Sequence, residues 1–223
     1  MIRHPSLSVL LGINAGFVDT LGFLALQGLF TAHVTGNFVT IAASLVTGHA
    51  GLIAKLLALP VFLLVVALCA LLEARWKARG VSLRNLLVVQ LALLVATALL
   101  AMLFGPFGDV DQPWAVATGL VGVAAMAVQN ALGRLHLGHL PPSTLMTGNS
   151  TQIALDLVGI GLGSAAVSPE RLRSFVLGVA AFALGCALAT LAFVTLHMGA
   201  FVPPVLLIAA AALHWQARPT TQI

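Results

Sequence analysis

The feature that most constrains this chain is a series of long apolar segments that almost no charged residue interrupts. Charged residues make up 7% of the sequence and hydrophobic residues 60%, whereas a soluble domain carries roughly 25% charged residues. A segment of about 20 apolar residues has the length needed to cross a bilayer as a helix. We therefore expect an all-α integral membrane protein. The six expected transmembrane helices cover residues 6–29, 52–76, 86–104, 114–135, 175–196 and 199–215.

Two further apolar stretches, residues 37–46 and 149–162, are shorter. At ~1.5 Å per residue they extend across about half of a bilayer, and we interpret them as re-entrant half-helices. The alternative is that both stretches span, which makes eight crossings.

The basic residues favour six spans, because Lys and Arg concentrate in cytoplasmic loops. With six spans, all basic loops and both termini fall on the cytoplasmic side, whereas eight crossings place either Arg3 or the most basic loop outside. Lys55 is a mild exception near an outer helix end, where its stem could snorkel. The residues used in this argument are Arg3, Arg75, Lys77, Arg79, Arg84, Arg134, Arg171, Arg173 and Arg218.

A polar tetrapeptide stands at the start of each short stretch. Val-Thr-Gly-Asn at residues 34–37 returns as Met-Thr-Gly-Asn at residues 146–149, and Asp19 aligns with Asn130 if one residue is inserted. Each half holds three expected spans, so the two halves enter the membrane from opposite sides. The sequence therefore predicts two inverted repeats within one structural domain. The repeats cover residues 1–108 and 109–223 and join in the outer loop 105–113.

Asp19 lies near the middle of the first expected span. A carboxylate at that depth costs ~2.5–3.5 kcal/mol on insertion scales, so it normally faces a polar cavity or a partner. We predict that Asp19 carries a proton or binds substrate, unless it only bonds a neighbouring helix end. Gln129 and Asn130 are predicted to line the same cavity, or else to form a helix–helix hydrogen bond. His33 could share a proton with Asp19, or could be a loop histidine near the outer face.

The Thr-Gly-Asn motif suits the start of a helix inside the membrane. The Thr hydroxyl can cap the first N–H groups, Gly allows a sharp turn, and Asn can cap the helix or point into a cavity. Two helix N-termini that face each other would attract an anion or a polar acceptor; the alternative is a pair of ordinary caps. The motif residues predicted to bind substrate are Thr35, Gly36, Asn37, Thr147, Gly148 and Asn149.

A polar stripe continues along the second short stretch. Gln152 and Asp156 follow Asn149 at helical spacing and share its face, and the first stretch has a milder stripe through Thr40 and Ser44. Such a face lines water or packs on polar neighbours. We predict that Gln152 and Asp156 line the solute site. Asp156 joins Asp19 and His33 as a candidate for proton coupling.

Several classes of function are not expected. The sequence has no catalytic set and no glycine-rich nucleotide signature, so we expect neither an enzyme nor a bound cofactor. His136 and His139 are three residues apart but lack further ligands, so no metal site is expected. The basic residues sit in short loops, which argues against nucleic acid. Cys69 and Cys186 are expected to be small buried hydrophobes.

The sequence resembles the YoaK family of bacterial membrane proteins. The resemblance rests on Gly16-Phe17-Val18-Asp19, on residues 32–37, on Gln129-Asn130-Ala131 and on residues 146–149. It covers nearly the whole chain and departs mildly at Val34, where the family more often has Met. It implies a multi-pass protein of the bacterial inner membrane with no established substrate.

These observations favour a small secondary transporter for a polar or anionic solute. The solute would lie near mid-membrane between the half-helix N-termini, Asp19 would carry a proton or bind it, and Asn37 and Asn149 would bind it directly. A passive channel is the first alternative. A non-transporting scaffold or partner subunit is the second, in which the polar residues only join helices. The expected partners are the lipid bilayer and the solute, and a homodimer is plausible.

Overall fold

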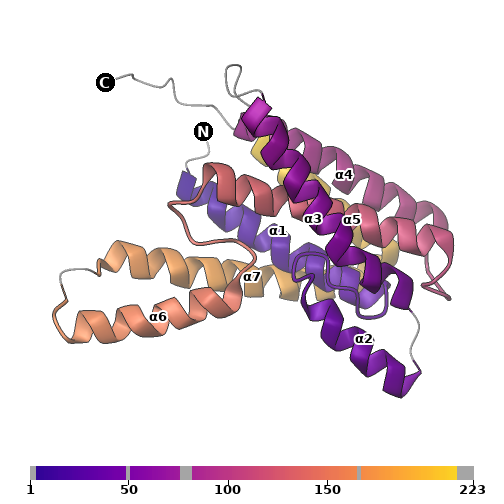
Figure 1. Ribbon diagram of the computed structural model, residues 1–223, viewed down its shortest axis with the longest axis horizontal. Helices are drawn as coiled ribbons and strands as arrows, with labels where there is room; N and C mark the ends of the chain where they lie inside the picture. The colour runs from indigo at the N-terminus through magenta and orange to yellow at the C-terminus, as the bar shows by residue number, and fades with distance from the viewer. Residues whose placement is uncertain (1–3, 49–50, 76–81, 165–166, 215–223) are drawn as a thin grey trace.

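The computed structural model describes residues 4–48, 51–75, 82–164 and 167–214. Arg3, Lys77, Arg79 and Arg218, used above to orient the chain, lie outside the described residues. The described part consists of helices joined by linkers and contains no strand (Figure 1). Its elements are α1 (His4–Ala25), α2 (Gly36–Thr47), α3 (Leu52–Arg75), α4 (Leu83–Phe104), α5 (Pro113–His136), α6 (Met146–Gly161), α7 (Pro169–Leu196), the 3-10 helix η1 (His197–Phe201) and α8 (Val202–His214).

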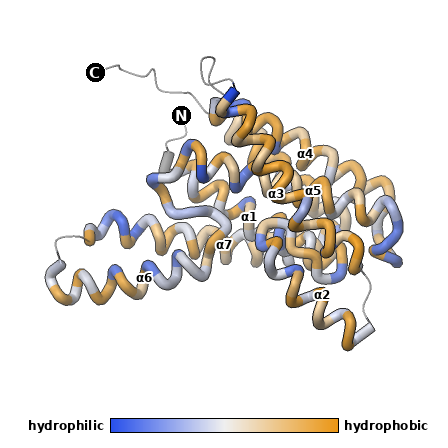
Figure 2. Tube along the Cα trace, viewed as in Figure 1, coloured by the Kyte–Doolittle hydropathy of each residue, from blue (hydrophilic) through white to orange (hydrophobic). Residues whose placement is uncertain are grey.

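Five helical stretches in the described residues are long and apolar enough to cross a membrane. Four of them are α1, α3, α4 and α5, and the fifth is the run Pro169–Leu213, which contains α7, η1 and α8. Figure 2 shows the apolar character of α3 and α4 along their lengths, whereas the segments that precede α2 and α6 are more polar. The expectation of an all-helical membrane protein agrees with this arrangement.

The first, fifth and last expected spans differ from the structure. α7 begins at Pro169 rather than at residue 175. α1 ends at Ala25 rather than at residue 29, because Gln27 and Gly28 adopt positive φ angles of 49° and 90°, which a right-handed helix cannot contain. Asp19 is consequently nearer the end of its helix than expected. The sixth expected span begins as the turn η1, and α8 itself has 13 residues.

Two clusters of buried side chains mark opposite ends of the helix bundle. One joins Leu7 at the start of α1 to Leu86 at the start of α4 and to Ala212 near the end of α8. The other joins Ala25 at the end of α1 to Ala58 near the start of α3 and to Phe201 just before α8. α1 and α4 therefore run in one direction, and α3 and α8 run in the other.

α7 lies parallel to α1 in a close glycine contact. A Cβ on Gly12 would meet Ala181, a Cβ on Gly16 would meet the Phe182 backbone, and one on Gly185 would meet the Ile13 backbone. Only glycine permits backbones to approach this closely. This contact joins the first helix of one half to a helix of the other half.

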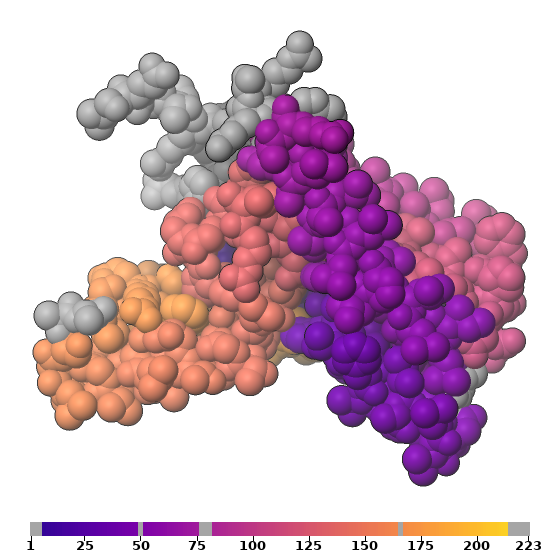
Figure 3. Space-filling view, viewed as in Figure 1, coloured from indigo at the N-terminus to yellow at the C-terminus, as the bar shows by residue number. Residues whose placement is uncertain are grey.

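The short helices α2 and α6 project from the bundle at separate places, α2 beside α3 and α6 beside α7 (Figure 1). Their bounds are near the expected 37–46 and 149–162, although α6 begins at Met146, before its motif ends. Figure 3 shows these segments on one face, with α2 and α3 in purple on one side and α6 in orange on the other. The N-terminal ends of both short helices point toward the middle of the molecule.

Candidate functional site

The linker between α1 and α2 folds around the Asp19 carboxylate. Oδ1 accepts hydrogen bonds from the backbone N–H groups of Thr31 (2.7 Å) and Ala32 (2.8 Å), and Oδ2 lies 2.6 Å from Nδ1 of His33. The Asp19 side chain is only 4% exposed. Because a buried carboxylate needs such partners, Asp19 determines how the chain turns from α1 into α2. Asp19 thus bonds the linker rather than a neighbouring helix end, and its role in carrying a proton or binding substrate stays a prediction.

His33 is the more exposed partner in its contact with this carboxylate. Its side chain is 33% exposed, and its ring stands edge-on to Phe182 with centroids 5.3 Å apart. His33 lies in the linker, outside the five candidate spans. The hydrogen bond to Asp19 raises the pKa of His33 above its ordinary value of 6.5, against the desolvation that lowers it, and the charge of Asp19 adds to the rise. The contact therefore favours an imidazolium near neutral pH.

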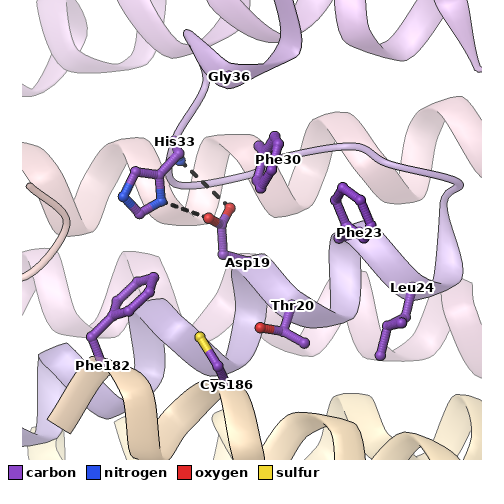
Figure 4. Close-up of a pocket in the computed structure, with 9 residues that line it drawn as sticks. All are labelled: Asp19, Thr20, Phe23, Leu24, Phe30, His33, Gly36, Phe182 and Cys186. Carbon is purple, nitrogen blue, oxygen red and sulfur yellow. Dashed lines mark hydrogen bonds and ion pairs between the residues drawn. The ribbon is translucent and has the colours of Figure 1, made fainter. Parts of the chain in front are cut away.

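A pocket of about 520 Å³, which we call the aromatic pocket, lies between α1 and α7. Figure 4 shows Asp19 and His33 at one side of it, Phe23 and Phe30 at another, and Phe182 and Cys186 of α7 opposite. Its walls are mostly apolar apart from the Asp19–His33 contact. Cys186, expected to be a buried hydrophobe, is half-buried and faces this pocket, whereas Cys69 is buried as expected.

A second pocket of about 340 Å³, which we call the central pocket, brings the two halves together. His33 and Thr35 line it from the first half, next to the start of α2. Asn130 and Arg134 of α5 line it from the second half, with Leu145 at the start of α6. The chain segments that lead into α2 and α6 thus meet at one cavity that holds a guanidinium and an imidazole.

The linkers before α2 and α6 are held by the same interaction. Asn37 Nδ2 donates to the carbonyl of Phe30 at 2.8 Å, and Asn149 Nδ2 donates to that of Pro142 at 2.9 Å, seven residues upstream in both cases. Asn37 also accepts from the Phe30 N–H. Both Asn side chains are 1% exposed. In this geometry they hold the linkers and do not reach the central pocket.

Asn130 repeats the role of Asp19 in a weaker form. Its Oδ1 accepts from the Thr144 hydroxyl at 2.6 Å, in the linker before α6. Asp19 accepts from three backbone N–H groups and from the Thr31 hydroxyl of the equivalent linker, and it also contacts the His33 ring. The two linkers thus make similar hydrogen bonds to α5 and α1, and of these two side chains only Asp19 is a carboxylate.

The helix starts differ from the expectation that Thr caps them. Thr35 stands at the N-cap of α2 but makes no side-chain cap hydrogen bond, so that prediction is wrong. The N–H groups of Gly36, Asn37 and Phe38 already donate to the carbonyls of residues 33–35. Thr147 lies inside the first turn of α6, since Leu145 is the N-cap, and both Thr147 and Gly148 are exposed. Thr35 lines the central pocket, whereas Thr147 and Gly148 do not.

The polar stripe of α6 faces α7 and is remote from the central pocket. Asp156 is 1% exposed, accepts from Gln152 Nε2 at 2.7 Å and lies 3.3 Å from Nε of Arg171 on α7. In the first half, Lys55 Nζ of α3 donates to Ser44 on α2 at 3.3 Å. Each short helix is thus tied to the following long helix by a cation. Lys55 is buried at 3% exposure between these helices, and snorkelling of its stem stays a prediction.

A family model described as "Protein of unknown function (DUF1275)" matches residues 7–214. The chain belongs to the DUF1275 family. No curated protein and no solved structure matches it. The resemblance found in the sequence is therefore confirmed at the level of an uncharacterised family, and the narrower YoaK name stays a prediction.

Sequence reasoning missed part of a buried amide cluster in this DUF1275 protein. Gln129 Oε1 accepts from Asn14 Nδ2 of α1 and from Gln90 Nε2 of α4, both at 2.8 Å, and all three side chains are fully buried. Gln129 Nε2 also donates to Ser143 in the linker before α6. Asn14 and Gln90 could have been noticed as amides inside apolar helices, but their convergence on Gln129 depends on packing. Among the described residues, no group of three or more His, Cys, Asp or Glu could hold a metal ion.

Proposed function

We propose that this protein is a small secondary transporter in which proton movement is coupled to a polar or anionic solute. The Asp19–His33 contact beside the central pocket is the observation that carries this proposal. The proposal assigns the chain no enzymatic activity. It places the chain in the bacterial inner membrane with both termini in the cytoplasm, as a homodimer or a monomer.

The proposed topology has six crossings, with α2 and α6 re-entering the membrane. The alternating direction of α1, α3, α4 and α8 supports it, because α1 and α3 run oppositely only if α2 does not span. Asn37 and Asn149 make matching hydrogen bonds to the linkers before α2 and α6, which supports two related halves. α7 and α8 count as separate crossings in this proposal, since the chain reverses at η1.

The central pocket is the proposed solute site. Its volume of about 340 Å³ falls within the ~300–1,000 Å³ of small-molecule pockets. Arg134 and His33 supply positive charge, and Thr35 and Asn130 supply polar groups. Asn37 and Asn149, expected to bind solute directly, position the linkers in this proposal. Gln129 supports the second linker through Ser143, and Gln152 and Asp156 anchor α6 away from the solute.

Coupling follows from reciprocal binding. An anion in the central pocket stabilises the imidazolium of His33, so solute binding and proton binding favour each other by the same factor. Asp19 holds the ring in place and shares its proton. Release of the solute lowers the proton affinity of His33, and the proton then leaves on the side where the solute was released.

Proteoliposomes with a trapped pH-sensitive dye would test this proposal. A panel of small organic and inorganic anions is added outside, and solute-dependent acidification is recorded. We expect at least one anion to move protons with the wild-type protein, and Asp19→Asn to abolish the proton signal. Asp109→Asn, an exposed carboxylate in the α4–α5 loop, is the matched control and should behave like wild type. Unchanged proton movement in Asp19→Asn would disprove the coupling.

The scaffold alternative draws on a different observation. Asn37, Asn149 and Gln129 use their amides within the protein, as residues that only join chain segments would. A scaffold moves no solute. It is favoured if the protein is folded and none of the anions in the panel is transported. A passive channel is distinguished by solute flux that needs no proton gradient and leaves the trapped dye unchanged.

A further inference from the structure

Four pockets form a series because neighbouring pockets share lining residues. A pocket of about 470 Å³, which we call the Lys55 pocket, shares Phe23 with the aromatic pocket. His33 lines both the aromatic and the central pocket. Arg134 and Asn130 line both the central pocket and a smaller one of about 80 Å³, which we call the Arg134 pocket. The series runs from the end of α1 to the end of α5, which lie at opposite ends of the bundle.

The charges along this series are positive at both ends. Lys55 lines the first pocket and Arg134 the last two, and His33 lies between them. Among the described residues that line these four pockets, Asp19 is the one carboxylate. Outside the pocket linings, the charge of Asp111 also acts on Lys55. Its oxygens are occupied by the linker N–H groups and by His33, so its charge is compensated locally.

The Lys55 ammonium is built into its pocket. Its side chain is 3% exposed, and its Nζ lies close to the backbone of Gly28 and Gly51, where an added Cβ would be 3.7 and 3.5 Å from it. Both glycines have φ of 90°, a conformation that other residues rarely adopt. Two tight turns thus wrap around the ammonium, and Ser44 holds it from α2.

We infer that the four pockets are the route of a small anion, with Lys55 at one mouth, Arg134 at the other, and Phe23 and His33 at the constrictions between them. The inference rests on the proposed transport function and names its substrate class. The two fixed positive charges repel a cation from this route. They attract an anion at each mouth, and the anion then binds next to His33. Phe23 stacks at a tilt on Phe30, with ring centroids 5.2 Å apart, so an aromatic pair narrows the passage from the Lys55 pocket.

Cys186 provides a reporter inside the route, because it lines the aromatic pocket midway along the series. The other thiol, Cys69, is removed as Cys69→Ala. The full-length protein in proteoliposomes is treated with two thiol reagents of similar size, the anionic sulfonatoethyl and the cationic trimethylammonioethyl methanethiosulfonate. Rates are normalised to those with free 2-mercaptoethanol, which removes the intrinsic difference between the reagents.

We expect the anionic reagent to react with Cys186 about three- to tenfold faster than the cationic one after normalisation, since one or two fixed charges lie near the path. Lys55→Gln and Arg134→Gln should each lower this ratio, and the double variant should bring it to about one. Lys55→Arg retains the charge and should retain the ratio. Arg84→Gln removes an exposed charge that lines none of the four pockets, and should leave the ratio unchanged.

Melting temperature in detergent identifies any variant that fails to fold. If Lys55→Gln does not fold, the reaction ratio of Arg134→Gln is compared with that of the charge-retaining Lys55→Arg variant instead. A ratio of one in the wild-type background, or a preference for the cationic reagent, overturns the anion assignment. A Cys186 that reacts with neither reagent shows that the pockets do not form a water-filled route. In each case the proton-movement assay still decides separately whether the protein transports.

Discussion

At the scale of single residues, Asp19 carries the most information. Its carboxylate accepts from three backbone N–H groups of the chain that follows α1 and contacts the His33 ring. Sequence reasoning found Asp19 and His33 because polar side chains are costly inside apolar segments. It predicted that Asn37 and Asn149 bind the solute, whereas in the structure their amides hold the linkers. An amide that holds a linker and an amide that binds a ligand look identical in sequence.

His33 makes the stability of the protein depend on pH. The contact with Asp19 raises the pKa of His33 above 6.5 in the folded state, so the stabilisation is complete below about pH 6.5 and is lost as pH rises through the raised value. We expect the difference in melting temperature between wild type and His33→Ala to be widest at acidic pH and to shrink at alkaline pH. A difference that is constant from acidic to alkaline pH contradicts a charged contact.

Asn37 should matter for stability more than the threonine beside it. Asn37→Ala removes the hydrogen bonds to the half-buried N–H and carbonyl of Phe30. We expect a loss of about 1–3 kcal/mol, the cost of leaving such a group without a partner. Thr35→Ala removes no cap hydrogen bond and should change the free energy of unfolding by less than about 0.5 kcal/mol. Urea unfolding in detergent micelles measures both variants. Equal changes in the free energy of unfolding of the two variants would show that the hydrogen bonds of Asn37 do not stabilise the linker.

At the scale of elements, the contact between α1 and α7 depends on glycine. Sequence hydropathy located both helices, but nothing in the apolar pattern indicated that they would be neighbours and parallel. The pairing follows from complementary shapes: glycines on both helices leave room for the backbone of the other. The contacts of Lys55 with Ser44 and of Arg171 with Asp156 likewise depend on how the helices pack, which the local sequence pattern does not show.

Adding a methyl group at this contact should destabilise the protein. In Gly16→Ala or Gly185→Ala the new Cβ meets backbone atoms that cannot rotate away, and we expect a loss of about 1–3 kcal/mol. Gly148→Ala is the matched control, since a Cβ there meets nothing within 4 Å and alanine favours a helix by up to about 1 kcal/mol. Thermal unfolding in detergent compares the three variants. A stable Gly185→Ala protein would contradict the close packing of α1 and α7.

At the scale of the whole molecule, the proposed six crossings place the start of α1 and the start of α4 on one side. Both belong to the same cluster of buried side chains. The loop between α4 and α5 then lies on the opposite side. An eight-crossing chain separates the first two positions, so labelling of three sites distinguishes the two topologies.

Single cysteines at these sites, in a background without Cys69 and Cys186, test the topology with a membrane-impermeant maleimide. Asp109→Cys should label in intact cells. Ser6→Cys and Ser82→Cys should label only after the membrane is opened. Opposite behaviour of Ser6→Cys and Ser82→Cys would show that α2 spans the membrane.

The sequence alone determined the helical class, the positions of most helices, the doubled motif and the need of Asp19 for polar partners, because hydropathy and the cost of buried charge act along the chain. Tertiary structure decided which polar residues meet. Asn14, Gln90 and Gln129 come from three helices, and the central pocket joins residues about one hundred positions apart. Such contacts depend on how helix surfaces fit together, and an apolar helix looks the same in sequence whichever neighbour it packs against. The sequence predicted that the two helix starts flank one site, but only the packed molecule shows which residues line the central pocket between them.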